Sequence, residues 1–210
     1  RALKGLALRK EVYSFDGSPA EQHPYTVVEN TFEVRCIQPQ GRQRNGVFFS
    51  VGREGVALNY ERNPADPRIA HTFELELDKY GNTRKACSVV YGRKLVDPAL
   101  PAQVTRDQQR LAISYGETDY TRDIAQGSPT RAYRLRTPCE SRSYEISGVA
   151  PAGDLFTFGE IAAAIATTTP LDYELLAGAA PQRRMLGHSR TLFRDNALAP
   201  LALGEWDSLG

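Results

Sequence analysis

The sequence has few of the residues that most often carry chemistry. Its 210 residues include three cysteines, three histidines, one methionine and one tryptophan. Cys36, Cys87 and Cys139 are odd in number and widely spaced, which excludes a disulfide framework and a CxxC metal site and favours buried, inert thiols. His23 and His188 fall in predicted loops and are isolated. We therefore expect no metal ion and no cofactor.

Long apolar runs and an excess of charge are also absent. The longest apolar run, "IAAAIA" at 161–166, is far shorter than the ~20 residues of a membrane-spanning helix. The 26 Lys and Arg residues balance 25 Asp and Glu residues, so no overall field attracts nucleic acid or an anionic membrane. The one basic loop, "GRQRNG" at 41–46, has no aromatic neighbours and is interpreted as a solvated turn. We expect neither nucleic-acid binding nor direct membrane contact.

The N-terminal residues lack the features of a signal peptide. "RALKGLALRKEV" has no basic segment followed by an apolar segment, and it is typical of the interior of a longer chain. We expect a fragment of a larger protein. The composition, 41% hydrophobic and 24% charged, is that of a folded domain, and the length allows a substantial core.

Most of the sequence predicts β-strands. The segment "PYTVVENTFEVRCIQPQG" at 24–41 is rich in Val, Thr, Tyr and Phe, which suit a pleated surface. Within it Phe32, Val34 and Cys36 alternate with Glu33 and Arg35. Further short strands are predicted at 46–52, 55–63, 110–117, 131–136, 141–148 and 189–193.

The clearest pattern is a hairpin over 68–92. A period of two gives one face that we expect to lie inside, formed by His71, Phe73, Leu75 and Leu77. The outer face would hold Thr72, Glu74, Glu76 and Asp78. The run ends at "DKYGN", residues 78–82, where an Asp, a Gly and an Asn favour a turn. The sequence therefore predicts an antiparallel hairpin with its loop at 78–82 and with Phe73, Leu75 and Leu77 buried.

One helix is predicted, near 157–167. Thr157 and Glu160 have the spacing of a capping box before an Ala/Ile run, and Pro170 discourages continuation. The following "LDYELLAGA" fits either a short helix or a strand. We predict a mainly β fold of antiparallel hairpins with one short helix. Its two parts would be a hairpin region at 1–149 and, at 150–210, the helix followed by a strand and a loop.

Asp66 and His71 are the strongest catalytic candidates, and we interpret them as structural. Asp66 could orient His71 as a base across the "ADP" corner, yet no GxSxG or catalytic-cysteine context supplies a nucleophile. Pro64 and Pro67 would stiffen the corner, and Asp66 and Arg68 would satisfy its backbone groups or pair with each other.

The carboxylate patterns are weak signals of catalysis. Glu74-Leu75-Glu76 matches the ExE pattern of ADP-ribosyltransferases, but strand alternation predicts both carboxylates on the outer, solvent-facing side. Glu140 and Glu145 are five residues apart, which places them on opposite faces of a strand and makes a poor catalytic pair. We expect no catalytic residue and no enzymatic activity.

Four segments carry a resemblance to a known family. They are "RALKGLALRKEVYSFDGS", "HPYTVVENTFEVRCIQPQG", "VFFSVGREGVALNYERNPADPRIAHTFELELDKYGNTRKACSVVYGRK" and "HSRTLFRDNALAPLALGEWDSLG". They resemble the region after the middle of the B component of bacterial Tc insecticidal toxin complexes, the TcaC/TcdB proteins, to which the Salmonella plasmid virulence B protein is related. "YERNPADPRIAH" and "DKYGN" are the most specific parts, and "DKYGN" is also similar to the RHS/YD hairpin repeat.

The resemblance implies an architectural role in a secreted toxin. In that family the B component and an RHS-repeat C component close a hollow β-sheet shell around the toxic C-terminal region of the C component. A β-propeller elsewhere in the B component docks the pore-forming A component. This segment would be shell wall, a region to which the family assigns no catalytic residues. The ADP-ribosyltransferase of the plasmid virulence relative lies in a separate domain that nothing here matches.

Two other functions stay open at the level of sequence. Trp206 and the ten tyrosines could form the aromatic platform of a carbohydrate-binding β module, although such residues more often pack in a core or at its rim. An ADP-ribosyltransferase-associated virulence domain would use Glu76. The leading hypothesis remains a non-enzymatic structural segment.

Overall fold

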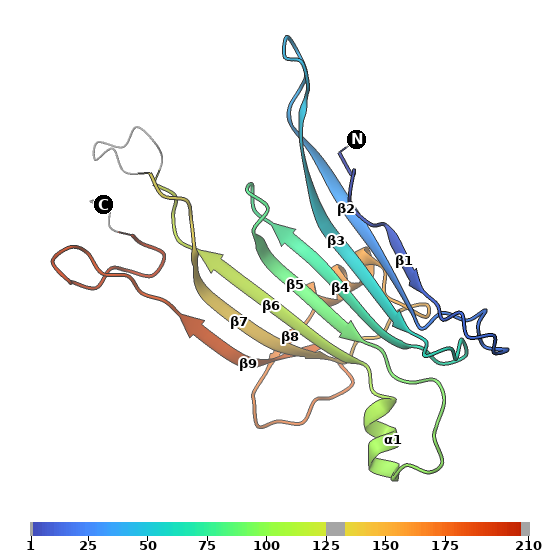
Figure 1. Ribbon diagram of the computed structural model, residues 1–210. Helices are drawn as coiled ribbons and strands as arrows, with labels where there is room; N and C mark the ends of the chain where they lie inside the picture. The colour runs from blue at the N-terminus through green and yellow to red at the C-terminus, as the bar shows by residue number, and fades with distance from the viewer. Residues whose placement is uncertain (1, 125–132, 207–210) are drawn as a thin grey trace.

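The fold is a single open β-sheet with two short helices. A computed structural model of the protein describes residues 2–124 and 133–206. Within these residues nine strands pair in the order β1-β2-β3-β4-β5-β6-β7-β9-β8, and every neighbouring pair is antiparallel except β8 and β9. Figure 1 shows α2 behind the sheet and α1 beyond its lower end. The prediction of a mainly β fold of antiparallel hairpins is confirmed.

The strand order follows the chain almost throughout, so most neighbours are joined by hairpins. Only the last two strands exchange places, because the chain passes through α2 and β8 before it forms β9. The elements are β1 (Arg9–Val12), β2 (Thr26–Gln38), β3 (Val47–Asn59), β4 (Arg68–Leu77), β5 (Thr83–Val90), α1 (Ala102–Gln108), β6 (Ala112–Tyr120), β7 (Pro138–Ser147), α2 (Phe158–Ala166), β8 (Thr169–Leu171) and β9 (Gln182–Arg190).

The predicted hairpin is present as β4 and β5, with its loop at residues 78–82. Asp78 turns inward instead of facing solvent, and its Oδ1 accepts hydrogen bonds from the backbone N–H groups of Tyr80 and Asn82 at 2.8 and 2.9 Å. Gly81 has a φ of +85°, and a Cβ there would displace the Phe49 ring, so both the backbone and the packing favour glycine at this position.

The burial predicted for this hairpin is only partly correct. Phe73 is 1% exposed, but Leu75 and Leu77 are half-buried. The pairing of β4 with β5 shifts register between Glu74 and Glu76, which leaves Leu75 without a partner in the ladder. This bulge ends the strict alternation on which the prediction rested.

The core lies between the middle of the sheet and α2. It comprises Phe73, Cys87, Val89, Ile113, Tyr115, Tyr144, Ile146, Phe156, Ile161 and Ile165. The predicted capping box is confirmed: the Thr157 side chain accepts from the Glu160 backbone N–H, and Glu160 accepts from the Thr157 backbone N–H. α2 thereby starts where Ile161 and Ile165 can reach the sheet.

Several predicted boundaries are wrong. The strands at 46–52 and 55–63 are one strand, β3, and the strand predicted at 189–193 is β9, which begins at Gln182 and ends at Arg190. Residues 131 and 132 of the strand predicted at 131–136 lie outside the described residues, and Arg134 forms only an isolated bridge with Ile124. The strands at 110–117 and 141–148 are present as β6 and β7.

The connections between strands also differ from the predictions. No pattern in the sequence predicts α1, which has no buried residue. "LDYELLAGA" forms neither a helix nor a strand beyond Leu171. In the part of the chain that the structure describes, neither helix is long and apolar enough to cross a membrane. The division into parts at 1–149 and 150–210 stays a prediction.

Candidate functional site

Asp66 links the loop before β4 to the residues that follow β5. It is 4% exposed; its Oδ2 accepts from Arg93 Nε at 2.8 Å and its Oδ1 from the Lys94 backbone N–H at 2.8 Å. Burial alone would raise the pKa of Asp66, but these hydrogen bonds hold it below its ordinary value. Of the two predicted alternatives, Asp66 accepts from a backbone group and does not pair with Arg68, which pairs with Glu61.

His71 is buried in a hydrogen-bonded chain that does not include Asp66. Its Nε2 is 2.8 Å from Glu54 Oε1 and its Nδ1 is 3.1 Å from the Tyr91 hydroxyl, which accepts from the Phe156 backbone N–H at 2.9 Å. One assignment of donors and acceptors satisfies Glu54, His71, Tyr91 and the Phe156 N–H together. In it the His71 Nε2–H donates to Glu54, and the Tyr91 hydroxyl donates to Nδ1. Burial lowers the pKa of His71, and Glu54 partly opposes this effect. The lowered pKa agrees with the neutral imidazole of this assignment.

This geometry favours the structural interpretation of the corner. A general base must reach the proton that it removes, and the His71 side chain is 1% exposed and lies 3.9 Å, centroid to centroid, from the Phe73 ring. The chain of hydrogen bonds instead ties β3, β4 and the end of β5 to the segment that leads into α2. Sequence reasoning missed Glu54 and Tyr91, because both are distant along the chain.

Replacing Asp66 with alanine should lower the free energy of unfolding by about 1–3 kcal/mol, because it leaves the Lys94 N–H and the Arg93 guanidinium without their acceptor. Asp154→Ala is the matched control. Its carboxylate also contacts residue 94, through Nζ, but it is exposed, so the loss should stay within about 0.5 kcal/mol. Urea unfolding of both variants measures the difference, and equal losses would contradict this role of Asp66.

The ExE pattern is split by the bulge at Leu75. Glu74 lies opposite Ala86 and accepts from the Thr83 hydroxyl at 2.5 Å, whereas Glu76 lies opposite Lys85 and pairs with its Nζ at 2.6 Å. Glu76 lines a cavity of about 340 Å³ beside α2. The prediction that both carboxylates share the outer face is therefore wrong, and the pair does not have the geometry that the pattern suggests.

Glu140 forms an ionic cluster with residues from β7 and β9. Its side chain pairs with Arg142, with Arg190 Nε at 2.7 Å and with His188 Nε2 at 2.6 Å. His188 is thus neither isolated nor in a loop, whereas His23 does lie in a turn. Glu145 lies on the opposite face, where it pairs with Arg184 and Arg110, so the prediction that the two carboxylates are separated is confirmed.

The cluster should make the stability of the fold depend on pH. Hydrogen bonds from Arg190 and then His188 lower the pKa of Glu140 from 4.5 to about 2. A carboxylate whose pKa is lower in the folded state stabilises the fold above its unfolded pKa, and this contribution is lost as pH falls through the folded pKa. We expect Glu140→Gln to lose less stability than the native chain between about pH 5 and about pH 2. Parallel pH profiles of thermal unfolding would contradict this assignment.

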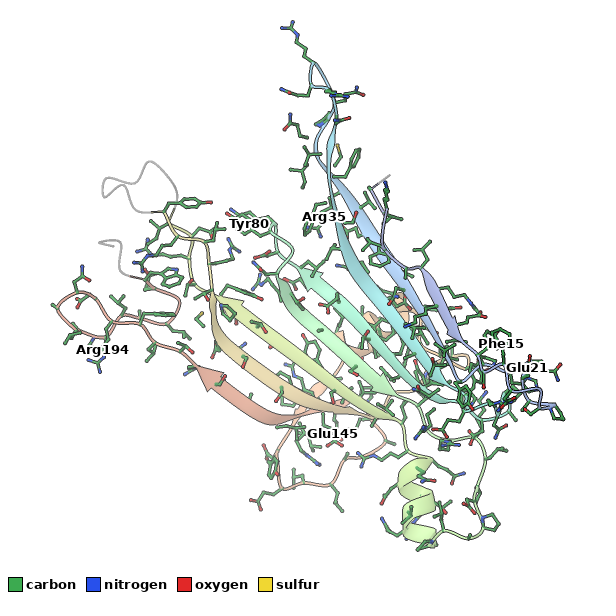
Figure 2. The ribbon with its side chains drawn as sticks, in the orientation of Figure 1. Phe15, Glu21, Arg35, Tyr80, Glu145 and Arg194 are labelled. Atoms are coloured by element: carbon green, nitrogen blue, oxygen red, sulfur yellow. The ribbon has the colours of Figure 1, made fainter. Side chains whose placement is uncertain are left out.

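One face of the sheet is formed mainly by small residues across β3 to β7. The residues that alternate with the core positions stand opposite one another across β3 to β7. We call this the small-residue face. Its small residues are Gly55, Ala57, Ala70, Thr72, Ala86, Ser88, Ser114, Gly116, Ser141 and Ser143, and the larger Glu74, Val90 and Glu145 lie among them. No helix covers its middle in Figure 1, and Figure 2 shows Glu145 at its lower part.

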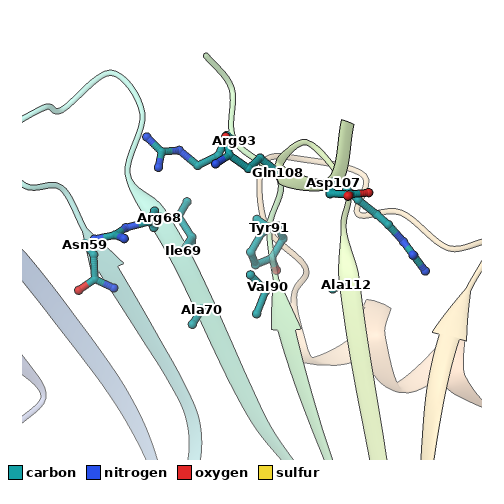
Figure 3. Close-up of a pocket in the computed structure, with 11 residues that line it drawn as sticks. Asn59, Arg68, Ile69, Ala70, Val90, Tyr91, Arg93, Asp107, Gln108 and Ala112 are labelled. Atoms are coloured by element: carbon teal, nitrogen blue, oxygen red, sulfur yellow. The ribbon is translucent and has the colours of Figure 1, made fainter. Parts of the chain in front are cut away.

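A shallow pocket lies at the end of the small-residue face, beside α1. Its volume is about 300 Å³, with an apolar floor that includes Ala70, Val90 and Ala112 (Figure 3). The Arg68 and Arg93 side chains at its rim already pair with Glu61 and with Asp66. Arg110, which also lines it, pairs with Glu145, so each arginine among the described lining residues already has a carboxylate partner.

The other chemical features also point to structure. Among the described residues no cluster of His, Cys, Asp or Glu could hold a metal ion. Cys87 and Cys139 are buried as predicted, and burial raises the pKa of Cys87 to about 12, but Cys36 is exposed. Tyr115 and Tyr144 stack within the core, and Trp206 packs on Phe193 at 4.7 Å. These residues therefore pack as expected from the sequence, and they do not form the aromatic platform of the alternative function.

The sequence of residues 1–144 matches the family described as "Insecticide toxin TcdB middle/C-terminal region". The chain belongs to this family. The match spans most of the chain, including the hairpin with its "DKYGN" loop and the corner at Asp66. No curated protein matches the chain significantly.

Solved structures of Tc toxins share the fold of this TcdB-family chain. The TcdB2–TccC3 crystal structure is 27% identical with a TM-score of 0.67, over 93% of this chain and 9% of that one. The crystal structure without the hypervariable C-terminal region is 29% identical with a TM-score of 0.70, over 97% and 10%. A Photorhabdus luminescens Tc holotoxin pore is 27% identical with a TM-score of 0.68, over 96% and 9%. The chain spans about a tenth of the length of these chains.

Proposed function

We propose that this chain is a non-enzymatic structural segment of the B component of a Tc-type toxin. It would form part of the wall of a β-sheet shell that, together with a C component, encloses and protects the toxic C-terminal region of the C component before delivery. The observation that carries the proposal is the open sheet itself. Its strands follow one another almost in chain order, and both of its edges offer backbone groups for further pairing.

The two faces of the sheet support a wall. α2 and the core cover one face, while the small-residue face presents Gly, Ala, Ser and Thr side chains. Short side chains of this kind offer little apolar area. A polypeptide that passes along this face would therefore be bound only weakly, and the face could equally lie against solvent. One face would meet the interior of the shell and the other would meet solvent.

The partners follow from the same proposal. The related structures are titled as complexes of TcdB2 with TccC3 and as a Tc holotoxin. By analogy, this segment would contact an RHS-repeat C component and the toxic region enclosed with it, and the rest of its polypeptide would dock the pore-forming A component. The complex would be secreted. No nucleic acid, no direct membrane contact and no cofactor form part of the proposal.

Photo-crosslinking from the two faces tests the wall. A crosslinking residue would replace Ser114 on the small-residue face or Ala163 on the exposed side of α2, in a complete B component assembled with its C component. We expect one of the two positions, and only one, to crosslink the enclosed toxic region. Crosslinks to that region from both positions, or from neither, would show that this sheet does not separate an interior from an exterior.

The isolated 210-residue chain should self-associate. β8 covers only the first three residues of β9, so the outer edge of β9 from Met185 to Arg190 has no neighbouring strand among the described residues. Such an edge is a template for another strand. Light scattering should show a mass that rises with concentration, and Leu186→Lys, at an exposed position on this edge, should reduce the rise. A native monomer at every concentration would instead indicate an autonomous domain.

A further inference from the structure

β2 and β3 extend well beyond the rest of the sheet as a two-stranded ribbon. β1 pairs with β2 only as far as Glu29, and β4 pairs with β3 only from Glu54. Residues 32–52, which we call the arm, therefore pair only with each other, from Phe32 opposite Gly52 to Gln38 opposite Val47. Figure 1 shows the arm projecting past the ends of the other strands.

The base of the arm is anchored to the molecule. The Arg35 Nη1 donates to the Asp78 carbonyl at 3.2 Å, and the Phe49 ring lies against Gly81 in the loop between β4 and β5. Figure 2 labels Arg35 close to the point where the arm leaves the sheet. The arm thus holds a defined direction, and its outer part, residues 36–48, is what it presents to its surroundings.

The outer part of the arm exposes apolar side chains. Phe48 is 54% exposed, Ile37 and Val47 are also exposed, and Cys36 stands opposite Phe48 on the same face. An isolated two-stranded ribbon is marginally stable in water, and exposed apolar residues add nothing to its stability. These side chains are well placed to be buried against another surface.

The outer part of the arm also carries positive charge. Residues 36–48 include Arg42 and Arg44 and no acidic residue. The nearest carboxylate along the chain, Glu33, pairs with Arg35 at 2.6 Å and faces Arg53 at 3.6 Å. The two arginines at the tip therefore suit a partner surface that carries carboxylates, and such charge pairs would favour one orientation of the arm on it.

We propose that the arm docks on the C component, with the Phe48 side of the ribbon in an apolar cleft and with Arg42 and Arg44 against carboxylates at the rim of that cleft. The inference rests on the proposed function and names one contact within it. Aromatic anchors with arginine neighbours dominate the energetics of many protein interfaces. The arm supplies both within one short segment.

Binding of complete B-component variants to the C component tests the arm. Arg42→Glu with Arg44→Glu, and separately Phe48→Ser, should each weaken binding at least about tenfold. Lys10→Glu with Arg106→Glu makes the same change in net charge at exposed positions away from the arm, and it should change affinity less than about threefold. Thermal unfolding of each variant shows whether it retains the fold.

The outcomes separate the two proposals. If the native B component does not bind the C component, the proposed function is wrong. If it binds and the arm variants bind as tightly as the native protein, the docking of the arm is wrong. Weaker binding by the arm variants, with binding by the control pair retained, supports the arm.

Alkylation of Cys36 provides a second readout that needs no substitution. Cys36 is exposed on the arm, and its reactivity can be followed in its own peptide by mass spectrometry. We expect fast labelling in the free B component and slow labelling in the complex. Equal labelling in both, or protection already in the free B component, would overturn the proposal, and the second result would show that the arm packs against its own polypeptide.

Discussion

Replacing Phe73 with alanine should lower the free energy of unfolding by about 3–5 kcal/mol. The ring is 1% exposed and lies at the centre of the core, against His71 at 3.9 Å and edge-on to Phe158 at 6.2 Å between centroids. Truncation would leave a cavity that the sheet on one side and α2 on the other cannot close. The midpoint of urea unfolding measures the loss.

Phe15→Ala is the control for this substitution. Phe15 is 90% exposed, so the same chemical change should alter the unfolding free energy by less than about 0.5 kcal/mol. A loss below about 1 kcal/mol for Phe73→Ala would mean that the sheet and α2 do not share the core described here.

Gly148→Ala should be similarly severe, at about 3 kcal/mol or more. Gly148 follows β7 with a φ of +72°, a region that is unfavourable for a residue with a Cβ. A Cβ there would also lie closer than 3.0 Å to the Ala180 carbonyl oxygen, just before β9 begins. The backbone would have to move at the point where β7 and β9 start to pair.

Gly153→Ala is the matched control in the same connection. A Cβ at Gly153 meets no atom within 4 Å, and its φ is not in the left-handed region, so the substitution should be neutral or slightly stabilising. Thermal unfolding of the two variants gives the comparison. Equal stability for both would contradict the close approach of Gly148 to residue 180.

Local sequence signals predicted the parts of the fold that are decided locally. The hairpin of β4 and β5 is set by alternation and a turn, and the start of α2 is set by the Thr157–Glu160 capping box. The bulge at Leu75 depends on how β4 aligns with β5, which no single strand encodes. For the same reason the alternation rule failed for Glu76.

The candidate site shows the same limit. Asp66 and His71 were identified from their spacing, but each has a partner that the spacing does not reveal. His71 bonds Glu54, 17 residues away, and Asp66 bonds Arg93, 27 residues away, because strand pairing brings them together. β9 was placed too late in the chain because its arginine-rich first half, Gln182 to Met185, has no clear alternation.

A structure of the complete B component assembled with its C component tests the central claim most directly. The account predicts that this sheet continues into neighbouring strands at its β1 and β9 edges, with one face toward an enclosed interior that holds the toxic region. A free-standing sheet with unpaired edges, or one with solvent on both faces, would contradict it.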